Sequence, residues 1–374
     1  MDMERLSRIP ARMQAFVDHG KAAGIVTLLA RHGRLAILSA VGYQDRENKI
    51  PMRTDTIVQI MSMTKPITSA GIVMLMEEGR LSLVDPVEKY LPDFRGQQLE
   101  GCPPTGDTTN CGLRRPSRPI NIRDLLTHTS GLPGDLKSPE LRWKRTLVET
   151  AALASQQTLV FEPGTRWLYS NVGMATLGRI IEVVSGQKYE QFISERILAP
   201  LGMQDTFYFT PSDKQKRIAA VYTAVDGKLK REDIDQLRPG AKYAAPEGGL
   251  YSTAADMANF YQMMLNKGTL DGHRLLSAPA VELMTNVQTG DLDTGFSPGI
   301  GFGLGWAVVR GPEGMFRLNS LGTFGHGGAY RTYGWADPAK DMIGVILLQR
   351  TNDGGDVADE INSFMAMAAA AIER

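Results

Sequence analysis

A serine and a lysine stand three residues apart in Ser62-Met63-Thr64-Lys65, ahead of the mostly apolar run PITSAGIVMLMEEG. We expect this run to form a largely buried helix that opens near Ser62, with Lys65 about 4.5 Å further along the axis on nearly the same face. A desolvated amine there can accept the hydroxyl proton, and the N–H groups of a helix start suit a developing oxyanion. The pair is therefore suited to nucleophilic catalysis, although this spacing also occurs on solvated helix faces.

Pro66 directly follows the lysine. In a regular helix its missing N–H would have bonded to the Ser62 carbonyl oxygen. We therefore expect a distorted first turn at the start of this helix.

Tyr169 and Asn171 lie after the turn Glu162-Pro163-Gly164 and just before the helical run VGMATLGRIIEVVSG. A phenol and an amide in this place could both point into a cleft. The alternative is that Tyr169 packs in the core while Asn171, or Ser170, only caps the helix.

A third segment, Gly325-His326-Gly327-Gly328-Ala329, lies between a strand-like run and Tyr330-Arg331. Its glycines would let the backbone approach a ligand closely, and the Ala329 N–H could supply an oxyanion donor. The alternative is a glycine-rich turn whose histidine has no chemical role.

A competing serine lies in Gly295-Phe296-Ser297-Pro298-Gly299, which matches the G-x-S-x-G nucleophile motif. That motif needs a strand before the serine and a helix after it. The preceding TGDLDT is polar and turn-like, and the following GIGFGLGW is too rich in glycine for a helix. We therefore interpret this segment as a flexible loop that could border the cleft.

The sequence indicates no metal site and no cofactor. No pair among the remaining histidines has the spacing of metal ligands: they are His19, His32, His128 and His273. We interpret His128 as a structural hydrogen-bonding residue. The Gly-x-Gly-x-Gly run at 301–305 lacks the setting of a dinucleotide fingerprint.

Cys102 and Cys111 are interpreted as free thiols in a polar loop, with a disulfide as the alternative.

The elements that must position these residues are strands near both ends of the chain and helices between them. Helical spacing predicts a first helix over about residues 6–17 and a last helix from a possible cap at Asp356 to residue 372. Strand-like runs follow the first helix and precede the last: GIVTLLAR, LAILSAVG, LGWAVV, MFRLNSL, TYGWAD and MIGVILLQ. From about residue 66 to 265 the pattern is mostly helical.

This order predicts an α/β (α+β) fold in which both termini join one antiparallel sheet, with the terminal helices on one face. We expect a sheet domain of residues 1–80 and 240–374 and a mainly helical domain of residues 81–239. Ligand sites favour the crevice between such lobes, so we expect the active site in that cleft.

Composition restricts the partners of this 374-residue chain. Lys+Arg and Asp+Glu are both 41, so the chain lacks the basic footprint of a nucleic-acid binder. No apolar run reaches the roughly 20 residues that span a bilayer, and the start shows no apolar signal-peptide segment. We expect a cytoplasmic protein acting on a small molecule, without nucleic acid or a membrane span, with secretion as an alternative. The sequence leaves monomer and homo-oligomer open.

Taken together and in this order, Ser62-x-x-Lys65, Tyr169-x-Asn171 and His326-Gly327-Gly328 resemble the three motifs of serine β-lactamases and penicillin-binding proteins. Three further segments resemble the class C branch of this family: DLLTHTSGL at 124–132, FEPGTRWLYSN at 161–171 and GGLYSTAADMANF at 248–260. The resemblance extends from about residue 8 to 372. It implies the β-lactamase/transpeptidase-like fold, a sheet domain with a helical domain.

The resemblance also implies a role for the motif residues. Ser62 would be the nucleophile that is acylated, and Lys65 and Tyr169 would share the proton transfers. Asn171 would contact the substrate or hold Lys65. The N–H groups of Ser62 and Ala329 would form the oxyanion hole.

The third motif departs from the family pattern. β-Lactamases and cell-wall peptidases usually have Lys-Thr-Gly, whose cation helps to bind a substrate carboxylate. Here the substrate-binding stretch is His326-Gly327-Gly328, and imidazole is mostly neutral near pH 7. The chain in this respect resembles the family VIII carboxylesterases, which keep Ser, Lys and Tyr but vary at this motif. Arg331 could in principle restore a cation.

We therefore predict a serine carboxylesterase that hydrolyses short-acyl esters through an acyl-enzyme on Ser62, with Lys65 and Tyr169 as the base. One alternative is a β-lactamase, D-amino-acid-type peptidase or amidase that uses the same residues. A second is a non-catalytic binding protein on the same fold, because fold does not imply function.

Overall fold

The computed structural model describes residues 1–101, 112–137, 139–295, 297–351 and 358–373. Cys102, Cys111 and the predicted cap Asp356 lie outside the described residues. None of the helices in the described part of the chain has the length and apolar character that a membrane span needs.

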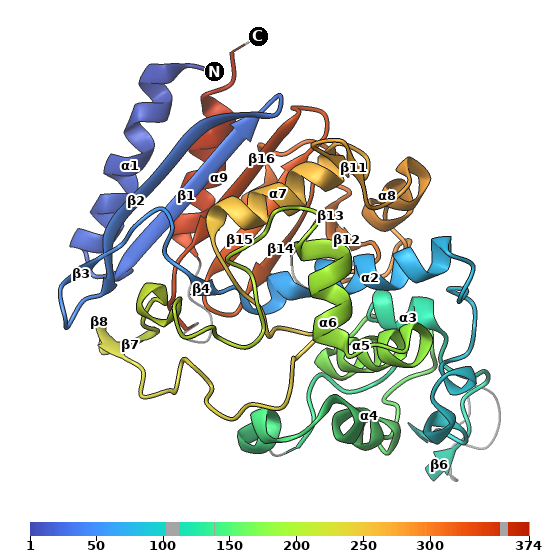
Figure 1. Cartoon of the computed structure of the whole chain (residues 1–374). Helices are drawn as coiled ribbons and strands as arrows, with labels where there is room; N and C mark the ends of the chain where they lie inside the picture. The colour runs from blue at the N-terminus through green and yellow to red at the C-terminus, as the bar shows by residue number, and fades with distance from the viewer. Residues whose placement is uncertain (102–111, 138, 296, 352–357, 374) are drawn as a thin grey trace.

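One eight-stranded antiparallel sheet joins the two ends of the chain (Figure 1). Its strand order is β12-β13-β14-β15-β16-β1-β2-β3. The strands are β1 (Gly24–Arg31), β2 (Arg34–Asp45), β3 (Ile50–Pro51), β12 (Ile300–Phe302), β13 (Ala307–Val309), β14 (Phe324–Gly328), β15 (Thr332–Asp337) and β16 (Met342–Leu347). In its centre β1 pairs with β16, with Val26 opposite Leu347. The prediction of one antiparallel sheet built from both ends is confirmed.

Both faces of the sheet are buried. Successive side chains of a strand point to opposite faces, so Val26 and Leu28 of β1 join one apolar core while Ile25 and Leu29 join another. Helices α1 (Met3–Asp18) and α9 (Asp359–Ala370) cover the second face, as the sequence predicts. Helix α7 (Ala254–Leu265) covers the first (Figure 1).

The regular structure in the middle of the chain is mainly helical, as the sequence pattern predicts, but long irregular segments separate the helices. Its helices are α2 (Lys65–Glu77), α3 (Ile122–Leu126), α4 (Leu147–Ser155), α5 (Asn171–Ser185) and α6 (Tyr189–Ile193), and α8 (Ala278–Thr285) follows α7. Short ribbons accompany them: β4 (Val58–Gln59) with β9 (Tyr251–Ser252), β5 (Leu99–Gly101) with β6 (Gly112–Arg114), β7 (Tyr222–Val225) with β8 (Lys228–Arg231), and β10 (Thr269–Leu270) with β11 (His273–Arg274). The first eleven residues of α2 are all buried, because α2 packs against α5 and α6.

The strand predicted from MFRLNSL is wrong. Residues Gly314–Phe316 form a 3-10 turn, and the side chains of Leu318 and Leu321 are exposed. The strand in this part of the chain is β14, which contains the His326 motif. Mixed polar and apolar residues also occur in solvated turns. The pattern of MFRLNSL therefore does not show by itself whether its leucines are buried in a core.

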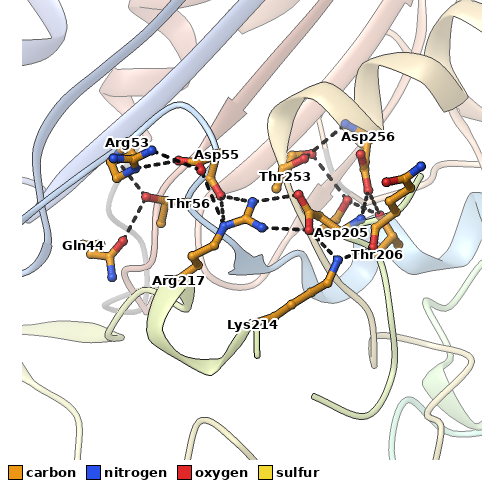
Figure 2. A network of polar contacts seen from close by, with 12 residues as sticks. Gln44, Arg53, Asp55, Thr56, Asp205, Thr206, Lys214, Arg217, Thr253 and Asp256 are labelled. Carbon is orange, nitrogen blue, oxygen red and sulfur yellow. Dashed lines mark hydrogen bonds and ion pairs between the residues drawn. The ribbon is translucent and has the colours of Figure 1, made fainter. Parts of the chain in front are cut away.

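A polar network connects segments that lie far apart in the sequence (Figure 2). Arg217 donates to the two carboxylate oxygens of Asp205 at 2.8 and 2.7 Å and also to the Asp55 carbonyl oxygen. Asp256, in the first turn of α7, accepts from the Asp205 N–H and the Thr206 hydroxyl, both at 2.8 Å. The network therefore ties residues 205–217 to α7 and to the loop before β4.

We expect Arg217→Ala to lower the free energy of unfolding by about 1.5–3 kcal/mol, because Asp205 loses two charge-assisted hydrogen bonds. Arg53→Ala is the control, because Arg53 is exposed and pairs with Asp55 at the surface, where such a pair contributes about 1 kcal/mol or less. Urea unfolding measures both variants. Equal losses would contradict a special contribution of Arg217.

Candidate active site

Ser62 lies in a 3-10 turn, η1 (Met61–Thr64), that leads directly into α2. Pro66 explains the distortion: it has no N–H, and the Ser62 carbonyl oxygen instead accepts from the Lys65 N–H. The predicted distorted first turn is confirmed. Met61 has φ +49°, a strained value for a residue with a side chain, so the surroundings hold this turn in place.

The Lys65 amine is buried beside this serine. Its Nζ lies 2.9 Å from Ser62 Oγ and donates to the Glu247 carbonyl oxygen at 2.5 Å. Burial lowers the pKa of Lys65 to about 7, with Arg142 acting in the same direction, whereas Glu247 and Asp135 oppose the shift. A substantial fraction of the amine is therefore unprotonated at neutral pH, as a general base requires.

Tyr169 brings a phenol to the same serine. Its hydroxyl is hydrogen-bonded to the Ser62 side chain, and the Lys65 Nζ lies 4.7 Å from the centroid of its ring. Burial raises the pKa of Tyr169 well above its usual value. The phenol is consequently protonated at neutral pH, so it can pass on a proton but is not itself a base in its resting state.

The residues after Tyr169 have separate tasks. Ser170 is the N-cap of α5, because its hydroxyl accepts from the Gly173 N–H at 2.9 Å. Asn171 is the first residue of α5, and its amide donates to the Asp135 carboxylate at 2.9 Å. The resemblance implies that Asn171 contacts the substrate or holds Lys65. In the structure the Glu247 carbonyl oxygen, not Asn171, binds the Lys65 amine.

The third motif is the end of β14 rather than a turn, and it packs directly against η1, the turn that contains Ser62. A Cβ at Gly328 would lie 2.3 Å from the Ile60 carbonyl oxygen, so a larger residue does not fit there. The same oxygen accepts from the Thr332 hydroxyl at 3.0 Å. This packing places Ala329 and Ser62 on one cavity, where the predicted oxyanion hole requires them.

The third motif carries no positive charge. The Nδ1–H of His326 donates to the Gly327 carbonyl oxygen at 2.7 Å, and burial together with the Lys65 charge lowers the pKa of His326 to about 3. The imidazole is therefore neutral at pH 7. Arg331 does not replace the cation as the sequence allowed, because its guanidinium is 3.0 Å from the Glu360 carboxylate and both side chains are almost fully buried.

Ser62, Tyr169 and the His326–Ala329 stretch open onto a cavity of about 440 Å³. Its remaining wall is largely apolar and includes Ile300, Ala307, Phe316, Tyr333, Ala358 and Ile361. Ser297 also lines this cavity, so the loop with the competing motif borders the cleft. That serine is followed by a turn and the short strand β12, so the strand-to-helix setting of a nucleophile elbow is absent there.

Three further residues shape the site. The Nδ1 of His128 accepts from the Ser170 N–H at 3.2 Å, and its ring lies 4.6 Å from the ring of Tyr169, which confirms its structural hydrogen-bonding role. Glu247 and Arg142, which form an ion pair beside Lys65, were not found from the sequence. The contact between Glu247 and Lys65 spans 182 residues, and no local pattern indicates it.

The part of the chain that the structure describes contains no cluster of three or more histidine, cysteine or acidic side chains that could hold a metal ion.

Known proteins resemble this chain over most of its length. A family model described as Beta-lactamase matches residues 9–364. Esterase EstB of Burkholderia gladioli is 28% identical, covering 92% of each chain, and D-alanyl-D-alanine-carboxypeptidase/endopeptidase AmpH of Escherichia coli is 28% identical, covering 93% of this chain and 85% of AmpH. The solved structure of EstCE1, described as a hydrolase with promiscuous acyltransferase activity, has a TM-score of 0.82 at 26% identity and covers 98% of both chains. The chain therefore belongs to the beta-lactamase family of serine hydrolases.

Proposed function

We propose that this protein is a serine carboxylesterase that hydrolyses esters of short acyl chains through an acyl-enzyme on Ser62. The observation that carries the proposal is the meeting of three groups at Ser62, which lines the cavity: the Ser62 hydroxyl is in hydrogen-bond contact with both the buried Lys65 amine and the Tyr169 phenol. In the proposed division into domains, Ser62 and Lys65 come from the sheet domain (1–80 and 240–374). Tyr169 comes from the helical domain (81–239), so the site lies between the two.

Lys65 is the base in this proposal, because its pKa is near 7 whereas that of Tyr169 is raised. Ser62 Oγ attacks the ester carbonyl carbon while its proton passes to the Lys65 amine. The tetrahedral oxyanion binds the N–H groups of Ser62 and Ala329. As the bond to the alcohol breaks, Tyr169 donates its proton to the alcohol oxygen and is reprotonated from Lys65. Water then attacks the acyl-enzyme with the same groups in reverse order, releasing the acid and restoring Ser62.

The chemistry around the nucleophile supports an uncharged ester over a carboxylate-bearing lactam or peptide. His326 is neutral and Arg331 is paired with Glu360, so neither offers the cation that a substrate carboxylate would need. The largely apolar cavity wall suits the hydrocarbon part of an ester. The names of EstB and EstCE1 agree with this function, whereas that of AmpH agrees with the alternative amide chemistry.

The ester and amide functions are separated by comparing p-nitrophenyl butyrate with nitrocefin. We expect kcat/KM for nitrocefin to be at least about 30-fold lower, since a carboxylate without its partner charge costs about 2 kcal/mol or more. A higher kcat/KM for nitrocefin would instead establish the β-lactamase alternative. A fluorophosphonate probe tests the non-catalytic alternative, which requires Ser62 to stay unlabelled at neutral pH.

A further inference from the structure

A buried ion pair that the mechanism above does not use lies against the catalytic lysine. Glu247 is only 4% exposed, and its carboxylate is paired with the Arg142 guanidinium and accepts from the Tyr243 hydroxyl at 2.8 Å. The backbone carbonyl of the same glutamate accepts from the Lys65 amine at 2.5 Å. One residue thus holds the amine through its backbone, and the charge of its side chain acts on the same amine.

The groups facing the Lys65 amine come from several segments. They are Ser62 of η1, His128 after α3, Asp135 before the 3-10 helix η4 (Pro139–Lys144), Arg142 of η4, Tyr169 before α5, Glu247 before β9 and His326 of β14. Burial lowers the pKa of both histidines and raises that of the tyrosine, so these three groups are uncharged near pH 7. The charges that remain are two carboxylates, Glu247 and Asp135, and one guanidinium, Arg142.

The two members of the ion pair act on the lysine in opposite directions. The Glu247 carboxylate favours the charged ammonium and raises the pKa of Lys65, and the Arg142 guanidinium lowers it. An unpaired carboxylate within a few ångströms shifts a buried amine by about 1–3 pH units, whereas a close opposite charge on that carboxylate cancels much of the effect. The charge on Arg142 therefore permits a carboxylate to sit next to a base that must lose its proton.

We propose that Arg142 and Glu247 are positioning residues that set the protonation of the Lys65 amine and thereby the lowest pH at which Ser62 is activated. This inference rests on the proposed function, in which Lys65 is the base. Neither side chain touches the reacting atoms. Both side chains act through the charge that they exert on the amine. Glu247 also binds the amine with its backbone carbonyl oxygen. Its two carboxylate oxygens are bound by Arg142 and Tyr243, and these contacts fix the position of the residue.

The test compares four variants with the wild type between about pH 5 and 9. Arg142→Met removes the guanidinium, Glu247→Gln removes the carboxylate but keeps the backbone carbonyl, the double variant removes both charges, and Arg142→Lys keeps the positive charge. Arg145→Met is the matched control, because Arg145 lies just after the end of η4 and its charge is not one of those that shift the pKa of Lys65. Two rates are measured: kcat/KM for p-nitrophenyl butyrate, and fluorophosphonate labelling of Ser62 followed by intact mass.

The unprotonated amine is the active form, so both rates rise with pH through the pKa of Lys65. We expect Arg142→Met to move this midpoint up by about one pH unit and Glu247→Gln to move it down by about one, each a roughly tenfold change in rate well below the midpoint. The double variant, Arg142→Lys and Arg145→Met are expected close to the wild type. A purely structural role would lower the plateau rate without moving the midpoints in opposite directions.

Absence of opposite shifts, with the wild-type midpoint still near pH 7, would overturn this inference and leave the proposed function intact. A wild type without any midpoint near pH 7 in either rate would overturn Lys65 as the base, and the inference with it. Labelling of Ser62 does not need ester turnover, so the inference is also tested if p-nitrophenyl butyrate is a poor substrate.

Discussion

Replacing Ser62 with alanine is expected to lower kcat/KM for p-nitrophenyl butyrate by about 10⁴- to 10⁶-fold, the range found when a serine nucleophile is removed. Without Oγ no acyl-enzyme forms, and what remains is the contribution of binding and of the oxyanion donors. The variant should fold normally, because Ser62 is only partly buried at the cavity. Steady-state kinetics measures the loss, and intact mass followed by peptide mapping should place the acyl group on Ser62 in the wild type.

The control for this substitution is Ser297→Ala. Ser297 lines the same cavity and lies in the competing G-x-S-x-G segment, so it tests the second possible nucleophile under the same conditions. We expect this variant to keep most of the activity. Loss of turnover confined to the Ser297 variant, or an acyl group mapped to that loop, would show that the nucleophile has been wrongly assigned.

Lys65→Met is expected to lower the same kcat/KM by about 10²- to 10⁴-fold, the usual contribution of a general base. Methionine fills most of the space of the buried side chain and removes a group whose charged form is costly to bury, so stability should be retained. Thermal unfolding checks the fold, and the pH profile checks the role. The rise in rate near pH 7 should vanish in this variant, because the titrating amine is gone.

Tyr169→Phe is the informative comparison for the lysine. It should also be slower, since the leaving alcohol loses its proton donor, but its rate should still rise near pH 7 because Lys65 remains. If instead the rise near pH 7 persisted in Lys65→Met and disappeared in Tyr169→Phe, the tyrosine would be the base and the lysine only its neighbour.

Much of the fold and of the candidate site could be predicted because the signals are local. The nearly continuous apolar residues of β1 and β16 reflect a sheet that is buried on both faces. Successive side chains point to opposite faces whichever strand is the partner. Pro66 distorts the turn at Ser62 whatever surrounds it, because its missing N–H is a property of the residue. The spacing of Ser62 and Lys65 likewise brings them together through the backbone alone.

Other features could not be predicted, because they depend on partners far away in the chain. MFRLNSL has the composition of a strand, but Leu318 and Leu321 meet no core. Arg331 is next to the third motif in sequence, yet its guanidinium forms a buried ion pair with Glu360 of α9. Arg142 and Glu247 lie about a hundred residues apart, and neither stands in a pattern that indicates a buried ion pair.

The sequence by itself therefore determined most strands of the main sheet and both terminal helices, the identity of the three chemical groups and the absence of a lysine in the third motif. Only the tertiary structure decided the charge on those groups. A side chain's pKa depends on the water that it loses and on the charges that it meets, and both are set by segments that the chain brings together from distant positions. The amine of Lys65 is a base near pH 7 because of the burial and the neighbouring charges that folding provides.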